Sequence, residues 1–427
     1  MNNTFKPKSK TVQNVTKNQQ LVVLMGSTII IGIIVGLSSL FLGIFLEYVE
    51  HLFLDYRETA SQPAPIGSSS FRRLLSVFIG SILAAIIWWL LRTKATATVS
   101  VKKALIGKKM PLWQTAIHVM TQIFYVGTGG SVGRELAPRE AGAMLAQKVE
   151  SLSNAMHIPQ LSADDRKLLI AAAAGAGFAG IYIAPITGMF FSVEILLKKM
   201  TLRTITVSLT MSTIAMFIGA ITKGFNPYYL VGDAKFSILS MVMVVVIAPF
   251  CGVAGAWFRK LCQWAEKGQE RGNNILWQLP IMGLMTGLVA TFFPQIMGNG
   301  RSLAQLVINS TGIWTISLLI IGALLKIVVT VLTIRSGASG GTLTPAIAIG
   351  SVLGAFLGMI LFLFVPSISI WEAAILGACT LLAASQQAPL MALFMIFEIC
   401  HLDYAMLLPL SFGVLISTIV SKRILTK

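Results

Sequence analysis

Long apolar stretches constrain this chain more than any other feature of its sequence. Six of them reach or approach the roughly 20 residues that a helix needs to cross the hydrocarbon core of a bilayer, and they cover residues 21–46, 74–91, 236–257, 275–293, 313–334 and 343–365. Only 11% of the residues are charged, whereas soluble domains carry about a quarter. The sequence shows no ten-residue segments of alternating polarity, which would build a membrane barrel. We therefore predict an all-α membrane protein that crosses the bilayer several times.

The formal net charge of +17 is concentrated in short segments beside these apolar stretches. Lysines precede the first stretch, the basic segment 94–109 follows the second, and further basic residues close the chain. The positive-inside rule places such segments in the cytoplasm, so we expect both termini there. Nucleic-acid binding is not expected, because no basic run is interleaved with aromatic residues. The first apolar segment is also too long for the core of a cleavable signal peptide.

The sequence indicates neither a metal site nor a cofactor. The four cysteines show no Cys-x-x-Cys spacing, and no two of the four histidines lie four residues apart with a carboxylate between them. The run Gly175–Gly180 has the glycine spacing of a dinucleotide fingerprint, but it follows an alanine-rich helical stretch instead of a strand. Close packing between helices explains these glycines better.

Two motifs recur in the same order in the two halves of the chain. Segments 133–138 (Gly-Arg-Glu-Leu-Ala-Pro) and 340–345 (Gly-Gly-Thr-Leu-Thr-Pro) each end a glycine-rich run. An Ala-Pro pair follows in each half, 47 residues after the first proline in one and 44 in the other. Such internal repeats define many transporter folds. We expect a basic tail over 1–20, a first half over 21–222 and a second half over 223–427.

Each half also carries a glutamate nine residues after the proline of its Ala-Pro pair, Glu194 in the first and Glu398 in the second. A carboxylate accepts hydrogen bonds well from the free N–H groups at a helix start. We expect both glutamates to be structural, each accepting from a helix start in its own half.

Glycine-rich breaks in the apolar segments predict an anion site. Helix starts expose several N–H groups and a partial positive charge, so broken helices that meet near the middle of the bilayer can hold an anion without a buried cation. The segments 127–135 and 337–342 are the best candidates for such starts, one from each half.

These residues resemble the signature regions of a known family. Gly-Arg-Glu at 133–135, Gly-Gly-Thr-Leu-Thr-Pro at 340–345 and Tyr-Ala-Met-Leu-Leu-Pro at 404–409 are similar to the three signatures of ClC chloride channels and chloride/proton exchangers, and the resemblance extends from about residue 21 to residue 422. It implies an inverted repeat of many tilted and broken transmembrane helices. It also implies a homodimer in a bacterial inner membrane, with one pore per subunit for chloride or a similar small anion, gated by voltage and pH. The implied protein is a transporter and not an enzyme, and it needs no cofactor.

The resemblance also implies a gate. Glu135 falls on the family's gating glutamate, whose carboxylate competes with the anion and moves aside when it is protonated. The filter around it would use Gly133, Arg134, Thr342 and Leu343, the last in place of the family's phenylalanine.

Hydroxyl groups complete the implied anion site. Tyr404 falls on the tyrosine whose hydroxyl coordinates the central ion. The family's serine loop is matched most weakly, by Ala-Thr-Ala-Thr-Val-Ser at 95–100. Thr96 is the expected donor, and Thr98 and Ser100 are alternatives.

Two questions stay open at this stage. Ile195 stands where one kind of exchanger carries an internal proton-transfer glutamate, so the sequence does not distinguish a channel from a chloride/proton exchanger. The altered serine loop also leaves fluoride as an alternative substrate.

A second class of function rests on the segment 337–340. Its Gly-Ala-Ser-Gly sequence matches the nucleophile turn of rhomboid-type proteases, with Ser339 as the nucleophile and His401 as a candidate base. This intramembrane protease hypothesis explains neither the repeat nor Glu135. It is therefore kept only as the alternative.

Overall fold

A computed structural model describes residues 17–233, 238–310 and 312–426. The first half holds α1 (Lys17–Leu54), α2 (Ser70–Thr93), α3 (Val101–Leu105), α4 (Leu112–Gly127), α5 (Leu136–Ala155), α6 (Ala163–Tyr182), α7 (Pro185–Phe190), the π-helix η1 (Phe191–Leu197) and α8 (Leu202–Lys223). The second half holds α9 (Ile238–Lys267), α10 (Ile275–Phe292), η2 (Pro294–Ile296), α11 (Arg301–Ile308), α12 (Ile313–Arg335), α13 (Leu343–Phe362), α14 (Ile370–Gln386), α15 (Pro389–Ile399), η3 (Tyr404–Met406) and α16 (Leu407–Leu425). Within these residues, the prediction of an all-α fold is confirmed.

Eight helices in the described part of the chain are long and apolar enough to cross a membrane, namely α1, α2, α8, α9, α10, α12, α13 and α16. Each of the six apolar stretches of the sequence overlaps one of them, and residues 236 and 237 of the third stretch lie outside the described residues. Many large apolar side chains on these helices remain exposed, among them Ile29, Phe41 and Phe250. Exposed apolar surface of this extent is suited to lipid and not to water. The protein is therefore a membrane protein.

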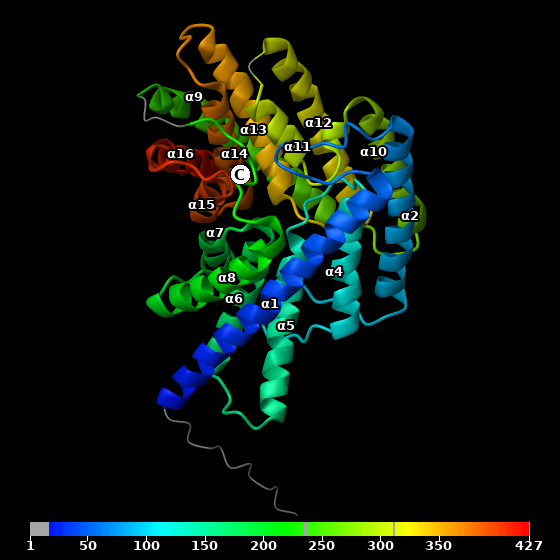
Figure 1. Cartoon of the computed structure of the whole chain (residues 1–427), viewed down its shortest axis with the longest axis vertical. Coiled ribbons are helices and arrows are strands. Elements are labelled where there is room, and N and C mark those ends of the chain that lie inside the picture. The colour runs from blue at the N-terminus through cyan, green and yellow to red at the C-terminus, as the bar shows by residue number, and fades with distance from the viewer. Residues whose placement is uncertain (1–16, 234–237, 311, 427) are drawn as a thin grey trace, which may run out of the picture.

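The long helix α1 crosses the face of the first half, over α4, α5, α6 and α8 (Figure 1). Behind it, α5 and α6 approach closely because glycines leave room for backbone. A Cβ added to Gly177 would collide with the carbonyl oxygen of Pro138, and one added to Gly142 with that of Ala173. The run Gly175–Gly180 therefore serves helix packing, as its sequence context indicates. In the second half, Gly350 and Gly377 bring α13 against α14 in the same way.

The Ala-Pro motif takes the same backbone path in both halves. Helices α6 and α14 end at left-handed residues, Ile183 with φ 56° and Gln387 with φ 55°. The alanines that follow have φ −132° and −138°, and the prolines then begin α7 and α15 at the position that tolerates proline best. Phe190 and Phe394 stack with their ring centroids 4.9 Å apart, so the two copies of the motif meet.

The glutamates after these motifs join the two halves. The Glu194 carboxylate accepts hydrogen bonds from the backbone N–H groups of Leu390 (3.1 Å) and Met391 (2.8 Å), at the start of α15. The Glu398 carboxylate accepts from the N–H groups of Ile186 (2.8 Å) and Thr187 (2.7 Å), at the start of α7, and from the Thr187 hydroxyl. Each glutamate therefore caps a helix of the opposite half. The expectation of caps within one half is wrong. Helices α7 and α15 lie against each other, so the start of each helix faces the glutamate of the other half.

Candidate anion-binding site

The two glycine-rich segments meet at the start of α13. Gly133 and Gly341 form an antiparallel bridge, with N–O distances of 2.7 and 2.8 Å. Helix α5 begins one residue after Glu135, and α13 begins at Leu343. The structure thus brings together the two segments that the repeat singles out.

The carboxylate of Glu135 lies at the N-terminus of α13. Its Oε1 accepts a hydrogen bond from the Leu343 backbone N–H at 2.6 Å, and its Oε2 accepts one from the Thr344 hydroxyl at 3.2 Å. The side chain is fully buried. Backbone N–H groups at a helix start form an anion site by themselves. A tethered carboxylate therefore occupies a position that suits a free anion.

Glycines on both sides make room for this carboxylate. A Cβ added to Gly133 or to Gly341 would collide with the Glu135 carboxylate. Neither residue has a positive φ, so space and not backbone conformation requires glycine there. The pocket around the carboxylate is thus built from both halves.

Lys326 supports the site from α12. It is fully buried, and its ammonium donates to the Ser131 hydroxyl (2.8 Å) and to the carbonyl oxygens of Ile296 (2.9 Å) and Gly298 (2.6 Å). Its charge also interacts with Glu135. Lys326 is also the single charge in the apolar stretch 313–334, and such a charge indicates function, although the predicted site did not include it.

A large vestibule leads to the start of α13. The cavity has a volume of about 910 Å³, and Gly341, Thr342 and Leu343 form part of its wall. Seven basic and three acidic side chains also line it, namely Arg92, Lys102, Lys103, Arg139, Lys198, Arg259 and Arg271, and Glu140, Glu194 and Glu266. This balance of four positive charges raises the local concentration of anions.

The hydroxyl groups of the segment 95–100 differ in position. Thr98 and Ser100 line the vestibule. Thr96, the residue first expected to supply the hydroxyl, is exposed and is not part of the vestibule wall. The structure therefore favours the two alternatives over Thr96 on position.

Tyr404 lies away from the vestibule. Gln386 and Gln387, directly before α15, are in the vestibule wall. Helix α15 then leads away over 11 residues, or about 16 Å, and Tyr404 follows its end. The side chain is 79% exposed, and its ring packs on Phe397 with centroids 5.8 Å apart. The structure thus does not bring Tyr404 to Glu135 or to the vestibule.

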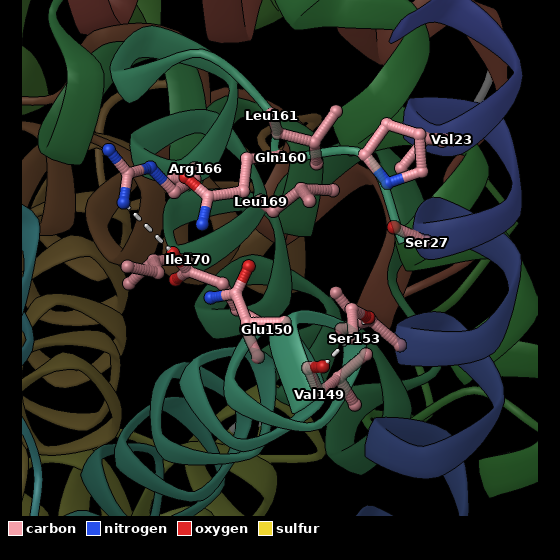
Figure 2. Close-up of a pocket in the computed structure, with 14 residues that line it drawn as sticks. Val23, Ser27, Val149, Glu150, Ser153, Gln160, Leu161, Arg166, Leu169 and Ile170 are labelled. Carbon is pink, nitrogen blue, oxygen red and sulfur yellow. Dashed lines mark hydrogen bonds and ion pairs between the residues drawn. The ribbon is translucent and has the colours of Figure 1, made fainter. Parts of the chain in front are cut away.

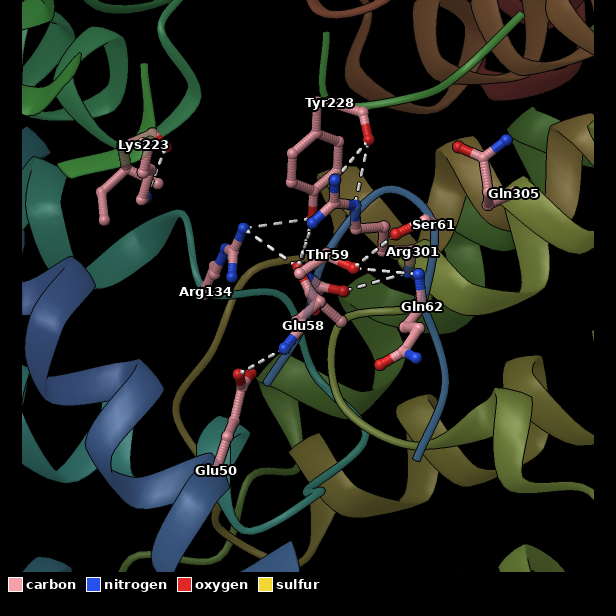
Figure 3. Close-up of polar contacts among 12 residues, drawn as sticks. Glu50, Glu58, Thr59, Ser61, Gln62, Arg134, Lys223, Tyr228, Arg301 and Gln305 are labelled. Carbon is pink, nitrogen blue, oxygen red and sulfur yellow. Dashed lines mark hydrogen bonds and ion pairs between the residues drawn. The ribbon is translucent and has the colours of Figure 1, made fainter. Parts of the chain in front are cut away.

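Arg134 takes part in a buried ion cluster and does not face the vestibule. Figure 3 shows Glu58, from the segment between α1 and α2, placed between two guanidinium groups. The Glu58 carboxylate lies 3.3 Å from the Arg134 guanidinium and 3.0 Å from that of Arg301. The Tyr228 hydroxyl accepts from Arg134 at 3.2 Å, and the Tyr228 carbonyl oxygen accepts from Arg301 at 2.6 Å.

The charges in this cluster are nearly removed from solvent. The side chains of Arg134, Arg301 and Glu58 are 5%, 8% and 12% exposed. Burial opposes ionisation of Glu58, but the two guanidinium groups outweigh it and hold the pKa of this carboxyl below its ordinary value. Glu58 is therefore ionised at neutral pH and fixes the guanidinium of Arg134, the residue before Glu135.

The protease residues are not brought together. The Ser339 hydroxyl accepts a hydrogen bond from Arg92 at 3.0 Å in the vestibule wall. His401 is exposed and follows the far end of α15. A serine needs a base within hydrogen-bonding distance, and this arrangement does not provide one.

A second cavity is too small to indicate another site. It lies where the start of α1 meets the end of α5, beside the Glu150–Arg166 ion pair of 3.2 Å, and its volume of about 30 Å³ holds little more than water (Figure 2). Among the residues that the structure describes, no three His, Cys, Asp or Glu side chains are grouped to hold a metal ion.

Comparison with known proteins gives consistent matches. The family model described as "Voltage gated chloride channel" matches residues 79–422. The chain is 27% identical over 415 residues to the voltage-gated ClC-type chloride channel ClcB of Salmonella typhi, covering 92% of this chain and 95% of the relative. It is 26% identical over 391 residues to ClcB of Escherichia coli O81 (strain ED1a), covering 88% and 90%.

Solved structures share the fold. A slow cyanobacterial Cl⁻/H⁺ antiporter matches with a TM-score of 0.77 at 22% identity, over 95% of each chain. A CLC-type fluoride/proton antiporter matches with a TM-score of 0.69 at 22% identity, over 96% of this chain and 97% of the other. At this identity the two likenesses establish the architecture alone.

Proposed function

The chain belongs to the voltage-gated chloride channel (ClC) family, whose model matches residues 79–422, and from this premise we propose that it carries chloride or a similar small anion across the membrane. The observation that carries the proposal is the Glu135 carboxylate at the N-terminus of α13. The basic vestibule that ends at the same residues supplies the anion. Membership of a family of transporters also favours transport over an enzymatic activity.

Glu135 acts as the gate in this proposal. An anion in the vestibule is attracted by its positive charge and reaches the wall at Gly341 and Leu343. While Glu135 is ionised, its carboxylate holds the Leu343 N–H group and excludes the anion. Protonation removes the negative charge and weakens both hydrogen bonds, so the anion can replace the side chain. Anion movement through this point then depends on pH and, because charge moves in the membrane field, on voltage.

The remaining ligands follow from position. Backbone groups at Gly133 and Leu343 contact the anion, and Thr342 lines its path. We assign the hydroxyl role to Thr98 and Ser100, because these two residues line the vestibule and Thr96 does not. Arg134 acts through its charge next to the gate, since its guanidinium is held by Glu58 and Tyr228.

The vestibule opens to the cytoplasm in this proposal. The basic segment 94–109 contributes Thr98, Ser100, Lys102 and Lys103 to its wall, and the positive-inside rule assigns such a segment to the cytoplasmic side. The end of α16 lies on the same side, because the Ser421 hydroxyl accepts from Gln387 at 2.8 Å. We infer a bacterial inner-membrane protein with cytoplasmic termini. Family membership supports a homodimer with one pore in each subunit.

Fluoride is the second candidate substrate. The likeness to a CLC-type fluoride/proton antiporter supports it. The relatives named ClcB and the higher TM-score to a Cl⁻/H⁺ antiporter favour chloride. Chloride is therefore placed first.

Flux in liposomes tests the proposal. Purified protein is reconstituted in liposomes loaded with chloride, and a potassium ionophore sets the voltage while electrodes record chloride efflux and external pH together. Efflux above protein-free liposomes supports anion transport, and repeating the assay with fluoride ranks the two anions. Folded protein that carries neither anion would refute the proposal.

A further inference from the structure

A buried histidine–glutamate pair lies in the wall of the vestibule, between α4 and α5. His118 Nε2 is 3.5 Å from Glu140 Oε2, and the two side chains are 8% and 9% exposed. Gln122 donates a hydrogen bond to the same Oε2 at 2.8 Å. Within the described part of the chain, no donor reaches Glu140 Oε1. Both His118 and Glu140 nevertheless contribute to the vestibule wall.

Trp88 determines which of the two groups can take a proton. Its indole N–H donates to His118 Nδ1 at 3.1 Å, and Trp88 is fully buried. An indole nitrogen only donates, so Nδ1 must be unprotonated and the imidazole is neutral, with its hydrogen on Nε2 facing Glu140. Protonation of His118 would place a hydrogen on Nδ1, where it would point at the indole N–H of Trp88. The carboxylate of Glu140 is therefore the group of this pair that binds a proton.

The position of Glu140 connects the vestibule with the gate. Glu135 and Glu140 are five residues apart at the start of α5, or about 7.5 Å along the helix axis. Leu136 and Arg139, between them, also line the vestibule, as do Gly341 and Leu343 beside the Glu135 carboxylate. The wall of the vestibule thus extends from Glu140 to the residues that hold the Glu135 carboxylate. Ile195 lines the same cavity but has no group that could carry a proton.

We propose that Glu140 is the inner proton-binding site of this protein and that protons reach Glu135 through it, so that the anion transporter is a proton-coupled exchanger. The inference rests on the proposed function. A hydronium ion in the vestibule gives its proton to Glu140 and leaves water. The neutral carboxyl group passes the proton through vestibule water to the Glu135 carboxylate, and Glu140 returns to its ionised form.

The charges around Glu140 fit this role. Arg139 is its neighbour on α5, and Arg92 from α2 acts electrostatically on His118. Arg139 keeps protonation of Glu140 reversible, because its charge favours the carboxylate over the neutral acid. The hydrogen bond from Gln122 and the contact with His118 hold Oε2 in place, so the proton is exchanged at Oε1.

The test measures the proton-to-anion ratio in the liposome assay. Glu140→Gln keeps the size of the side chain but cannot exchange a proton, and we expect the ratio to fall at least tenfold while anion efflux continues. Glu140→Asp should restore most of the ratio. Glu372→Gln is the matched control, since Glu372 is a buried glutamate bonded to Ser240 at 2.7 Å outside the vestibule wall, and it should leave the ratio unchanged.

A second variant separates proton binding from a merely structural role. Trp88→Phe removes the donor to Nδ1 and allows His118 to become charged beside Glu140. A cation there favours the ionised carboxylate, so the pH profile of coupled proton movement should shift to lower pH. A structural defect would lower anion and proton movement together without this shift.

Two results would overturn the inference. Unchanged coupling in Glu140→Gln would show that protons take another route. Anion efflux from the wild-type protein without any proton movement would also overturn the inference, but it would leave the proposed function intact. Absence of anion flux in the wild type would instead refute the proposed function, and the relay with it.

Discussion

Replacing Glu135 by glutamine should raise the affinity for chloride about 100-fold at pH 8. The carboxylate occupies the position proposed for the anion through two hydrogen bonds, from the Leu343 N–H and from the Thr344 hydroxyl. A hydrogen bond to a charged group contributes about 1.5–3 kcal/mol and a neutral one about 0.5–1.5 kcal/mol. Removing the charge thus costs the side chain about 2 kcal/mol over both bonds. The weaker interaction with the start of α13 adds about 1 kcal/mol, and a total of about 3 kcal/mol corresponds to roughly 100-fold in competition.

The assay is isothermal titration of chloride into purified protein in chloride-free buffer, at pH values between 5 and 8. The affinity of Glu135→Gln should not depend on pH. Glu372→Gln serves as the control and should behave like the wild type. A variant within threefold of the wild type at pH 8 would show that the carboxylate does not compete with the anion.

Three further substitutions test the surroundings of the site. Glu58→Gln leaves two buried guanidinium groups without their carboxylate and should lower the free energy of unfolding by about 3 kcal/mol. Because the pKa of Glu58 is lowered in the folded protein, its stabilisation is fully present above the ordinary pKa of about 4.3 and is lost only as the pH falls through the folded value. The variant should therefore melt at a temperature below that of the wild type by the same amount at every pH from 8 to 5. Gly341→Ala adds a methyl group that collides with the Glu135 carboxylate, and the variant should show slow chloride efflux that does not depend on pH. Efflux from the variant that keeps the pH dependence of the wild type would contradict this prediction. Glu398→Gln should destabilise the protein by roughly 1 kcal/mol more than Glu194→Gln in thermal unfolding, because Glu398 accepts three hydrogen bonds and Glu194 accepts two. A larger loss of stability in Glu194→Gln than in Glu398→Gln would refute this explanation of the caps.

The helices and the meeting of Glu135 with Leu343 could be predicted because their signals are local. An apolar stretch of about 20 residues determines a spanning helix without reference to the rest of the chain. Glycine-rich breaks determine where a helix can begin. The repeat then indicates that the two breaks are equivalent, and the structure pairs them through Gly133 and Gly341.

The positions that depend on packing between segments could not be predicted. Tyr404 follows the end of α15 that points away from the vestibule, and a sequence motif does not show the direction of a helix. In the segment 95–100, a shift of two residues separates the exposed Thr96 from Thr98 in the vestibule wall. The partners of Glu194 and Glu398 are 196–212 residues away, and the repeat alone does not show whether a cap acts within a half or between halves.

The charged residues that were missed carried a signal of another kind. Lys326 lies in an apolar stretch where a charge is costly, and this cost alone indicates function. His118 could be recognised only with Trp88, because the direction of one hydrogen bond determines which group of the pair takes the proton.

The caps exchanged by Glu194 and Glu398 also impose an order on synthesis. Glu194 leaves the ribosome 196–197 residues before the amides that it binds, a delay of about 10–40 s at 5–20 residues per second. During that time the carboxylate of Glu194 and the start of α7 lack their partners in a membrane that offers no water to replace them. The nascent first half must therefore keep these groups at the membrane surface or in contact with the insertion machinery. Final closure of the site is thus a late event, which comes only after α15 has been made.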